Sequence, residues 1–64
     1  MDPGRRALRV SDHDRNAVLR RLDRAVGEGR LTLDEFEERM STTLAARTRG
    51  ELDDVTTDLP ADLW

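Results

Sequence analysis

The 64-residue chain has no cysteine, and its large apolar residues are few. Without cysteine, neither a disulfide nor a thiolate metal site can supplement the core. The large apolar side chains are nine Leu, four Val, two Met, one Phe and one Trp, with no Ile or Tyr. Because about a dozen such side chains can be buried, we expect one domain with a few kcal/mol of net stability.

Lysine and long apolar runs are also absent. All eleven basic residues are arginine, against fourteen acidic residues. The resulting net charge of −3 argues against non-specific attraction to nucleic acid or anionic lipid. No apolar run approaches the roughly 20 residues that span a bilayer, and no signal peptide is evident. The sequence therefore predicts a soluble, cytoplasmic chain that does not itself insert into a membrane.

Three helix-start signals are the most informative feature of what is present. Each places a hydroxyl at an N-cap and a carboxylate three residues later, so that both side chains can satisfy free backbone N–H groups. The pairs are Ser11 with Asp14, Thr32 with Glu35, and Thr48 with Glu51. At the middle signal, Leu31 and Phe36 add a hydrophobic staple. The sequence therefore predicts three short helices and an all-α fold.

Apolar spacing and helix breakers set the expected limits of these helices. We expect helices at about 12–26, 33–47 and 49–58, with Pro60 ending the third. Gly27 and Gly29 supply left-handed residues, and the connection between the first two helices is short. These two helices are therefore expected to form an antiparallel αα-hairpin, with the third packing beside it.

The ends of the chain lie outside this helical pattern. Residues 1–7 are expected to be disordered, residues 8–60 to form the domain, and residues 61–64 to be a tail. Leu8 and Val10 are expected in an extended segment that alternates against the core. The full predicted core consists of Leu8, Val10, Val18, Leu22, Val26, Leu31, Phe36, Met40, Leu44, Leu52, Val55 and Leu59. Glu35 and Arg39 are also expected to form an i,i+4 ion pair.

Arg15 is the residue that least fits its predicted position. It falls in the middle of the apolar arc of the first helix. One interpretation is structural: the guanidinium pairs with Glu51, Asp54 or Asp58, or donates to the last carbonyls of the second helix. The other interpretation is that Arg15 binds a partner, and the sequence leaves both open.

Further candidates for partner binding are arginines of the first helix and the single tryptophan. Arg20, Arg21 and Arg24 lie toward the end of the first helix, where they also match its macrodipole. Trp64 is either a C-terminal anchor on the core or an interface residue, since tryptophan is enriched at binding hot spots. The candidate partner-binding residues are therefore Arg15, Arg20, Arg21, Arg24 and Trp64.

No residue pattern points to catalysis, a metal or a cofactor. His13 is the only histidine, and its neighbours Asp12 and Asp14 diverge from it on a helix, so the three cannot converge on a metal. The acidic start of the second helix, from Asp34 to Glu38, lacks the loop geometry of a calcium site. It would also repel phosphates if this helix entered a DNA groove. Nucleic-acid binding and a small-molecule substrate are therefore not expected.

The sequence also resembles a known family. The run Leu22–Leu44, which contains Gly27–Arg39, resembles the SHOCT motif, a short bacterial helical hairpin. Arg9–Arg15 resembles the Arg-x-Ser-Asp-x-Asp-Arg opening of an actinobacterial SHOCT-like domain of unknown function. The stretch 44–52 and the ending Asp58-Leu59-Pro60 are similar to that family too. The resemblance covers about residues 8–60.

The resemblance implies a role in protein association. Such domains often stand at the N-terminus of longer actinobacterial proteins, frequently ahead of membrane-spanning segments, and no catalytic residues are recognised in them. We therefore expect a non-catalytic module that binds another protein or a second copy of itself. Two alternatives stay open, a small DNA-associated regulator and a structural spacer without a partner.

Overall fold

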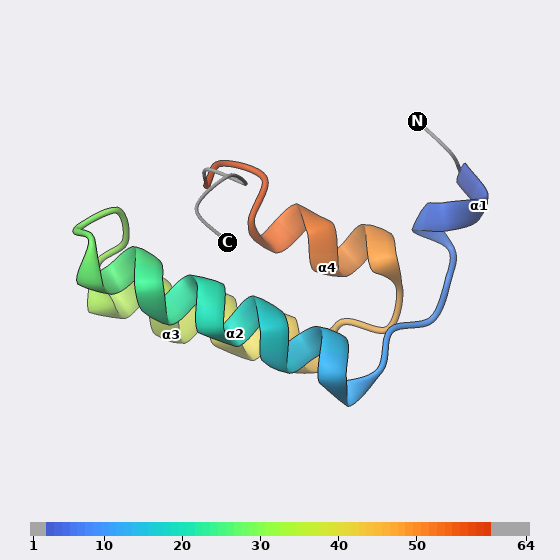
Figure 1. Ribbon diagram of the computed structural model, residues 1–64, viewed down its shortest axis with the longest axis horizontal. Coiled ribbons are helices and arrows are strands. Elements are labelled where there is room, and N and C mark those ends of the chain that lie inside the picture. Colours follow the sequence, from blue (N-terminus) through green and yellow to red (C-terminus); the bar gives the residue numbers. More distant parts are fainter. Residues whose placement is uncertain (1–2, 60–64) are drawn as a thin grey trace.

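The computed structural model describes residues 3–59, which form four helices. These are α1 (Pro3–Arg6), α2 (Asp12–Gly27), α3 (Leu33–Ala45) and α4 (Arg49–Val55). The fold is all-α, as predicted, and α2 and α3 form the expected antiparallel hairpin (Figure 1). The short α4 packs on one face of this hairpin, and α1 lies beside the start of α4 (Figure 1). Pro60 and the predicted tail 61–64, with Trp64, lie outside the described residues.

The hairpin turn follows the expected glycine chemistry at Gly29, whereas the prediction for Gly27 is wrong, because Gly27 is the last residue of α2 and has no positive φ. Gly29 has φ 75°, in the left-handed region that favours glycine. The N–H groups of Arg30 and Leu31 both reach back to the carbonyl of Ala25, at 2.8 and 3.4 Å, and so close the end of α2. Leu31 then enters the core with only 6% of its surface exposed. The turn thereby places the staple residue that precedes α3.

Two predicted helix ends are corrected by the structure. The second helix ends at Ala45 instead of residue 47, because Ala46 is extended and the carbonyl of Arg47 accepts from Val10 N at 3.1 Å. The third ends at Val55 instead of residue 58, because Thr56 N bonds to Asp53 O in a tighter turn. Both corrections arise from hydrogen bonds that apolar periodicity does not record.

The N-terminal segment departs most from its prediction. Residues 3–6 are helical where the sequence predicts disorder. The chain then runs beside the α3–α4 connection, where Arg9 and Thr48 form an isolated antiparallel bridge. Arg49 N donates to Leu8 O at 2.8 Å, the second hydrogen bond that holds this segment. This pairing joins residues that are about forty positions apart in sequence, so local sequence signals do not reveal it.

The core is smaller and contains smaller residues than predicted. Leu22 and Ala25 are fully buried, and Leu52 is nearly so. The complete buried apolar cluster is Val18, Leu22, Ala25, Leu31, Ala46, Leu52, Val55 and Leu59, with Val10, Leu19, Val26 and Phe36 packed against it. Thr43 and Thr56 are buried as well. Small side chains reach the centre because they let the helices approach closely.

Two predicted core residues are wrong. Leu8 is 60% exposed, because the turn after α1 directs its backbone into hydrogen bonds with Arg5 and Arg49 and its side chain stays outside the core. Leu44 is 59% exposed, because it lies on a side of α3 that no described helix covers. Met40 is only half-buried. The apolar stripe of α3 is therefore divided between the core and the surface.

Candidate interaction surface

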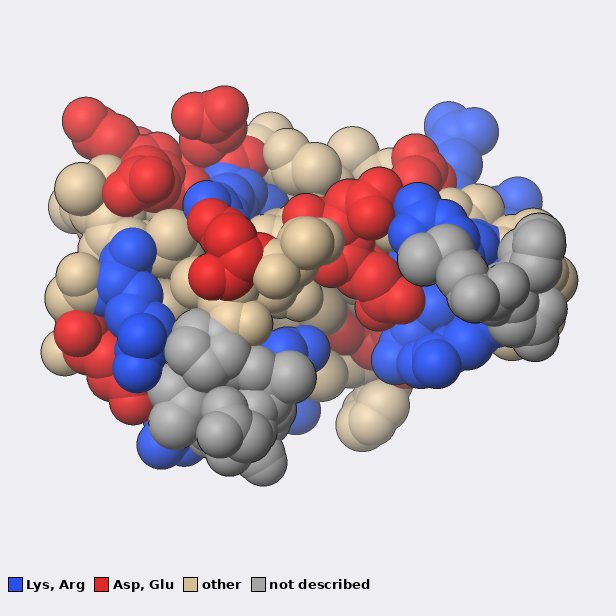
Figure 2. Space-filling model, turned by 90° about the horizontal axis from the view of Figure 1, so that it is seen from above, with Lys and Arg blue, Asp and Glu red and all other residues tan. Residues whose placement is uncertain are grey.

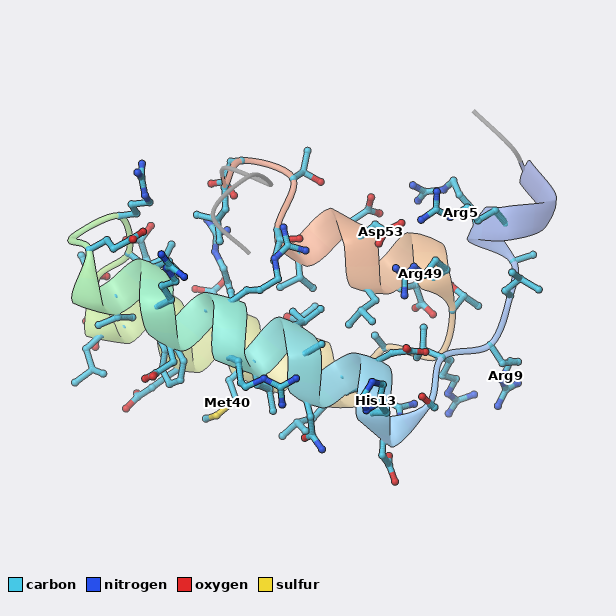
Figure 3. The ribbon with its side chains drawn as sticks, viewed as in Figure 1. Arg5, Arg9, His13, Met40, Arg49 and Asp53 are labelled. Carbon is cyan, nitrogen blue, oxygen red and sulfur yellow. The ribbon has the colours of Figure 1, made fainter. Side chains whose placement is uncertain are left out.

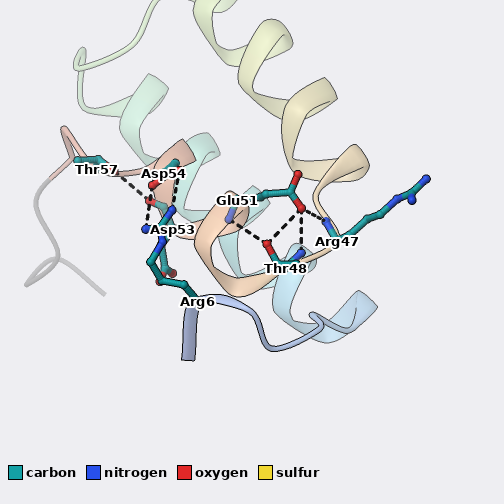
Figure 4. A network of polar contacts seen from close by, with 7 residues as sticks. All are labelled: Arg6, Arg47, Thr48, Glu51, Asp53, Asp54 and Thr57. Atoms are coloured by element: carbon teal, nitrogen blue, oxygen red, sulfur yellow. Dashed lines mark hydrogen bonds and ion pairs between the residues drawn. The ribbon is translucent and has the colours of Figure 1, made fainter. Parts of the chain in front are cut away.

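All three capping boxes close in both directions. Asp14 N donates to Ser11 Oγ at 3.2 Å, and Ser11 N donates to Asp14 Oδ2 at 3.0 Å. Thr32 and Glu35 make the equivalent bonds at 3.1 and 2.9 Å. At α4 the Glu51 carboxylate accepts from the backbone N–H groups of both Thr48 and Arg47 (Figure 4). These six side chains are therefore engaged in hydrogen bonds at the starts of the helices.

The cap carboxylates predict how stability depends on pH. Backbone N–H donors hold the pKa of Asp14, Glu35 and Glu51 below the ordinary values of 3.8 for Asp and 4.5 for Glu. A lowered folded-state pKa contributes stability that is present above the ordinary pKa and is lost as the pH falls through the folded value. We therefore expect the melting temperature to be flat from about pH 7 to about pH 5 and to fall at lower pH.

Circular-dichroism melts across this pH range check the expectation. The matched variant carries Asp14→Asn, Glu35→Gln and Glu51→Gln together. Its melting temperature is expected to be lower at neutral pH and to change less on acidification. Parallel curves for the two proteins would show that the caps do not cause the acid loss.

Arg15 joins the start of α2 to the end of α3. Its Nε and Nη2 donate to the carbonyl oxygen of Ala46 at 3.0 and 2.8 Å, and its Nη1 donates to Asp12 Oδ1 at 2.9 Å. The side chain is 21% exposed. Of the interpretations open from the sequence, donation to the end of the second helix is the geometry found. The three carboxylates expected as alternative partners, Glu51, Asp54 and Asp58, make no hydrogen bond or ion pair with Arg15.

Arg39 makes a second connection of this kind, between α3 and the end of α4. Its guanidinium donates to both carboxylate oxygens of Asp58, at 2.6 and 2.8 Å, and to the Val55 carbonyl at 3.1 Å. This hydrogen bonding raises the pKa of Arg39 and lowers that of Asp58. Glu35 and Arg39 attract each other electrostatically, but they make no direct ion pair, because the Glu35 carboxylate caps Thr32 instead.

In the sequence, the one feature that Arg39 and Asp58 share is that both stand in segments that resemble the family. Asp58 stands in the family-like ending of the chain, and Arg39 ends the family-like hairpin motif. A pair nineteen residues apart cannot be derived from helix periodicity, because the approach depends on how α4 packs.

Ion pairs also hold α1 and α4 in place. Arg6 reaches Asp54 at 3.1 Å, and its guanidinium lies over Gly50, where a Cβ would approach within 2.8 Å (Figure 4). Arg49 lies 3.5 Å from Asp53 (Figure 3). It also lies 3.9 Å from Asp14 of α2. These contacts place the Asp14 side of α2 toward α4.

Of the remaining candidate arginines, three share one surface of α2. Arg20, Arg21 and Arg24 line a shallow hollow together with Ala17. Arg24 also pairs with Glu28 at 3.3 Å, and burial lowers the pKa of Arg21. Arg15 lies apart from this group, and Trp64 is outside the described residues. The structure therefore brings three of the five predicted partner-binding residues together.

The charged surface does not form a single basic region on the side of α4. Acidic and basic side chains are interspersed there (Figure 2). His13 is exposed in the first turn of α2 (Figure 3). Within residues 3–59, no three His, Asp or Glu side chains are arranged to hold a metal ion. None of the helices described there has the length and apolar character needed to cross a bilayer.

An apolar surface lies on the side of the hairpin opposite α4. Arg39 faces α4, and Met40, Leu33 and Leu44 lie about 100–140° round α3 from it. Figure 3 places Met40 at the edge of the hairpin away from α4. Leu33 is 63% exposed and Leu44 is 59% exposed. Leu33, Met40 and Leu44 follow one another at spacings of seven and four residues and so form one stripe along α3.

The second helix contributes to the same surface. Leu19 lies about 140° round α2 from Asp14, which faces Arg49 of α4. It is half-buried and packs against the core cluster. We call Leu19, Leu33, Met40 and Leu44 the outer hairpin face. Single exposed leucines are common, but an aligned set across two helices marks an interaction surface more often.

These features define a small helical module built from a capped hairpin and a docked short helix. Residues 8–60 match the model of the DUF1707 SHOCT-like domain, and the chain belongs to this family.

The relatives of this chain include mycobacterial proteins. Uncharacterized protein Rv0966c of Mycobacterium tuberculosis (strain ATCC 25618 / H37Rv) is 42% identical over 54 residues, which is 84% of this chain and 27% of the relative. Uncharacterized protein Rv0048c of the same strain is 38% identical over 56 residues, or 88% of this chain and 19% of the relative. The chain thus spans less than a third of either relative. No solved structure matches it significantly.

Proposed function

We propose that this domain is a non-catalytic protein–protein association module that works in the cytoplasm as part of, or accessory to, a larger bacterial protein. The observation that carries the proposal is the outer hairpin face, where Leu33 and Leu44 stay mostly exposed on a well-capped helix. Full burial of an exposed leucine contributes about 1.5–3 kcal/mol, so covering the exposed part of these two side chains favours binding. The short share of each relative that is matched supports a role beside other domains.

Several of the charged residues have uses within the fold. Arg15 and Arg39 bind backbone carbonyls, and the cap carboxylates bind backbone N–H groups. The start of α3 carries Asp34 and Glu35 in its first turn, which disfavours phosphate contact there. Association with a protein is therefore better supported than association with DNA.

Site-specific photo-crosslinking in actinobacterial cells tests this proposal. A photoreactive phenylalanine derivative replaces Leu44 on the outer hairpin face, and in a matched control it replaces Thr57, which is exposed near the end of α4. We expect discrete adducts of higher mass from position 44 and none of the same mass from position 57. No adduct from either position would instead support a spacer without a partner, and identical adducts from both would indicate non-specific contact.

A further inference from the structure

Two carboxylates border the outer hairpin face, one on each helix. Asp23 of α2 is four residues after Leu19, and Glu37 of α3 is four residues after Leu33. Residues at this spacing are neighbours on a helix surface. Both carboxylates are exposed, and neither makes an ion pair or hydrogen bond within residues 3–59. The apolar face thus has a negative border on both sides.

These two acids differ from the acids that the fold uses. Asp14, Glu35 and Glu51 close helix caps, and Asp54 and Asp58 hold Arg6 and Arg39. Asp23 and Glu37 have no such role in the described part of the chain. Arg24, next to Asp23 in the sequence, pairs with Glu28, and Arg39, two residues after Glu37, is directed toward Asp58. The negative border is therefore available to a partner.

The sign of this border selects among occupants. A second copy packed face to face presents the same two carboxylates, so like charges approach in a setting where their repulsion opposes binding. An anionic lipid surface meets the same repulsion. An amphipathic helix with an apolar stripe and basic residues on both flanks can lie along the apolar face that α2 and α3 share and pair with both acids.

We propose that the outer hairpin face docks a cationic amphipathic helix of a partner protein. This deepens the proposed function, on which it rests, by assigning the chemistry of the partner. The docked helix covers the hairpin from the side opposite α4 and brings Leu19, Met40, Leu33 and Leu44 into one buried layer. Its Lys or Arg residues lie beside Asp23 and Glu37.

Binding of two designed peptides tests the assignment. Both are labelled helical peptides with leucine at i, i+3, i+4 and i+7, and they differ only in carrying lysine or glutamate on the flanks. Fluorescence anisotropy with the complete chain measures their affinity. We expect the lysine peptide to bind at least about tenfold more tightly than the glutamate peptide, and the difference to shrink at about 1 M salt.

Adjacent glutamates of α3 provide matched variants. Glu37→Gln is expected to weaken the lysine peptide by about fivefold and to reduce its salt dependence. Glu38→Gln removes the same charge about 100° round the helix, on the side of Arg39, and is expected to leave affinity unchanged. Leu44→Ser is expected to abolish binding while circular dichroism shows an intact fold, since this side chain is mostly exposed.

Three results would overturn the inference. Equal affinity for both peptides would show that the face does not select a partner by charge. Equal effects of Glu37→Gln and Glu38→Gln would show that Glu37 does not lie at the binding site. Concentration-dependent dimerisation in light scattering that Leu44→Ser abolishes would assign the face to a second copy. If crosslinks from position 44 appear and the lysine peptide shows no preference, the inference fails and the proposed function stands. If neither crosslinks nor peptide binding appear, both fail.

Discussion

Replacing Leu52 by alanine is expected to lower the free energy of unfolding by about 2–5 kcal/mol. Leu52 is only 1% exposed and is the most deeply buried side chain of α4. With seven residues, α4 is too short to be stable as an isolated helix, so its packing on the hairpin decides whether it forms. A domain of this size has a total stability of about 3–10 kcal/mol, so the loss is a large fraction of it.

Urea denaturation followed by circular dichroism measures this effect. The matched control is Leu33→Ala, which removes the same atoms from a side chain that is 63% exposed. It is expected to change stability by no more than about 0.5 kcal/mol. A similar loss for both variants would mean that α4 does not depend on its contact with the hairpin.

Replacing Arg15 by methionine is expected to lower the free energy of unfolding by about 2 kcal/mol. The substitution keeps an apolar stem but removes the donors to the Ala46 carbonyl and to Asp12. The Ala46 carbonyl accepts two bonds from this guanidinium, at a residue whose own surface is 2% exposed. In a chain of this length, such a loss lowers the melting temperature by roughly 10 °C.

Differential scanning calorimetry checks the prediction for Arg15, with Arg20→Met as the control. Arg20 is exposed on α2 and is expected to tolerate the change within about 0.5 kcal/mol. The contact geometry supports the structural interpretation of Arg15. The Arg15→Met change can also be made in the chain that carries the photoreactive residue at position 44. If this variant melted like the unaltered chain but gave no crosslinked adducts, Arg15 would instead be a partner-binding residue.

The helix starts could be predicted from the sequence because capping chemistry is local. A hydroxyl and a carboxylate three residues apart determine both hydrogen bonds of a capping box, without reference to the rest of the chain. Thr32 with Glu35 shows this, and the beginning of each longer helix follows from the same rule. The helix ends at Ala45 and Val55 were less predictable, because other segments compete for their backbone groups.

The arginine contacts illustrate the limit of local rules. Arg39 has an acidic residue one turn before it, so an i,i+4 pair with Glu35 is the local expectation. The Glu35 carboxylate is engaged at the helix cap, and Asp58 is brought within reach only when α4 has docked. The partner of Arg39 is therefore a property of the tertiary arrangement.

The candidate interaction surface likewise depends partly on local sequence and partly on tertiary packing. Periodicity correctly places Leu33, Met40 and Leu44 on one stripe of α3, but it cannot say which part of an apolar arc will be covered. A single short helix packs on one side of the hairpin, and this leaves the other side exposed. The arginines weighed as partner-binding residues were conspicuous in sequence, whereas the exposed leucines resembled core residues.

By itself, the sequence determined the all-α class, the three capped helix starts, the hairpin and the family, because each depends on residues close together in the chain. The tertiary structure decided where α1 and the bridge at Arg9 lie, which carbonyls Arg15 and Arg39 bind, and which leucines remain outside. Those outcomes depend on which segments meet across long separations. Helix periodicity specifies an apolar arc, and the packing of α4 specifies which edge of that arc stays exposed.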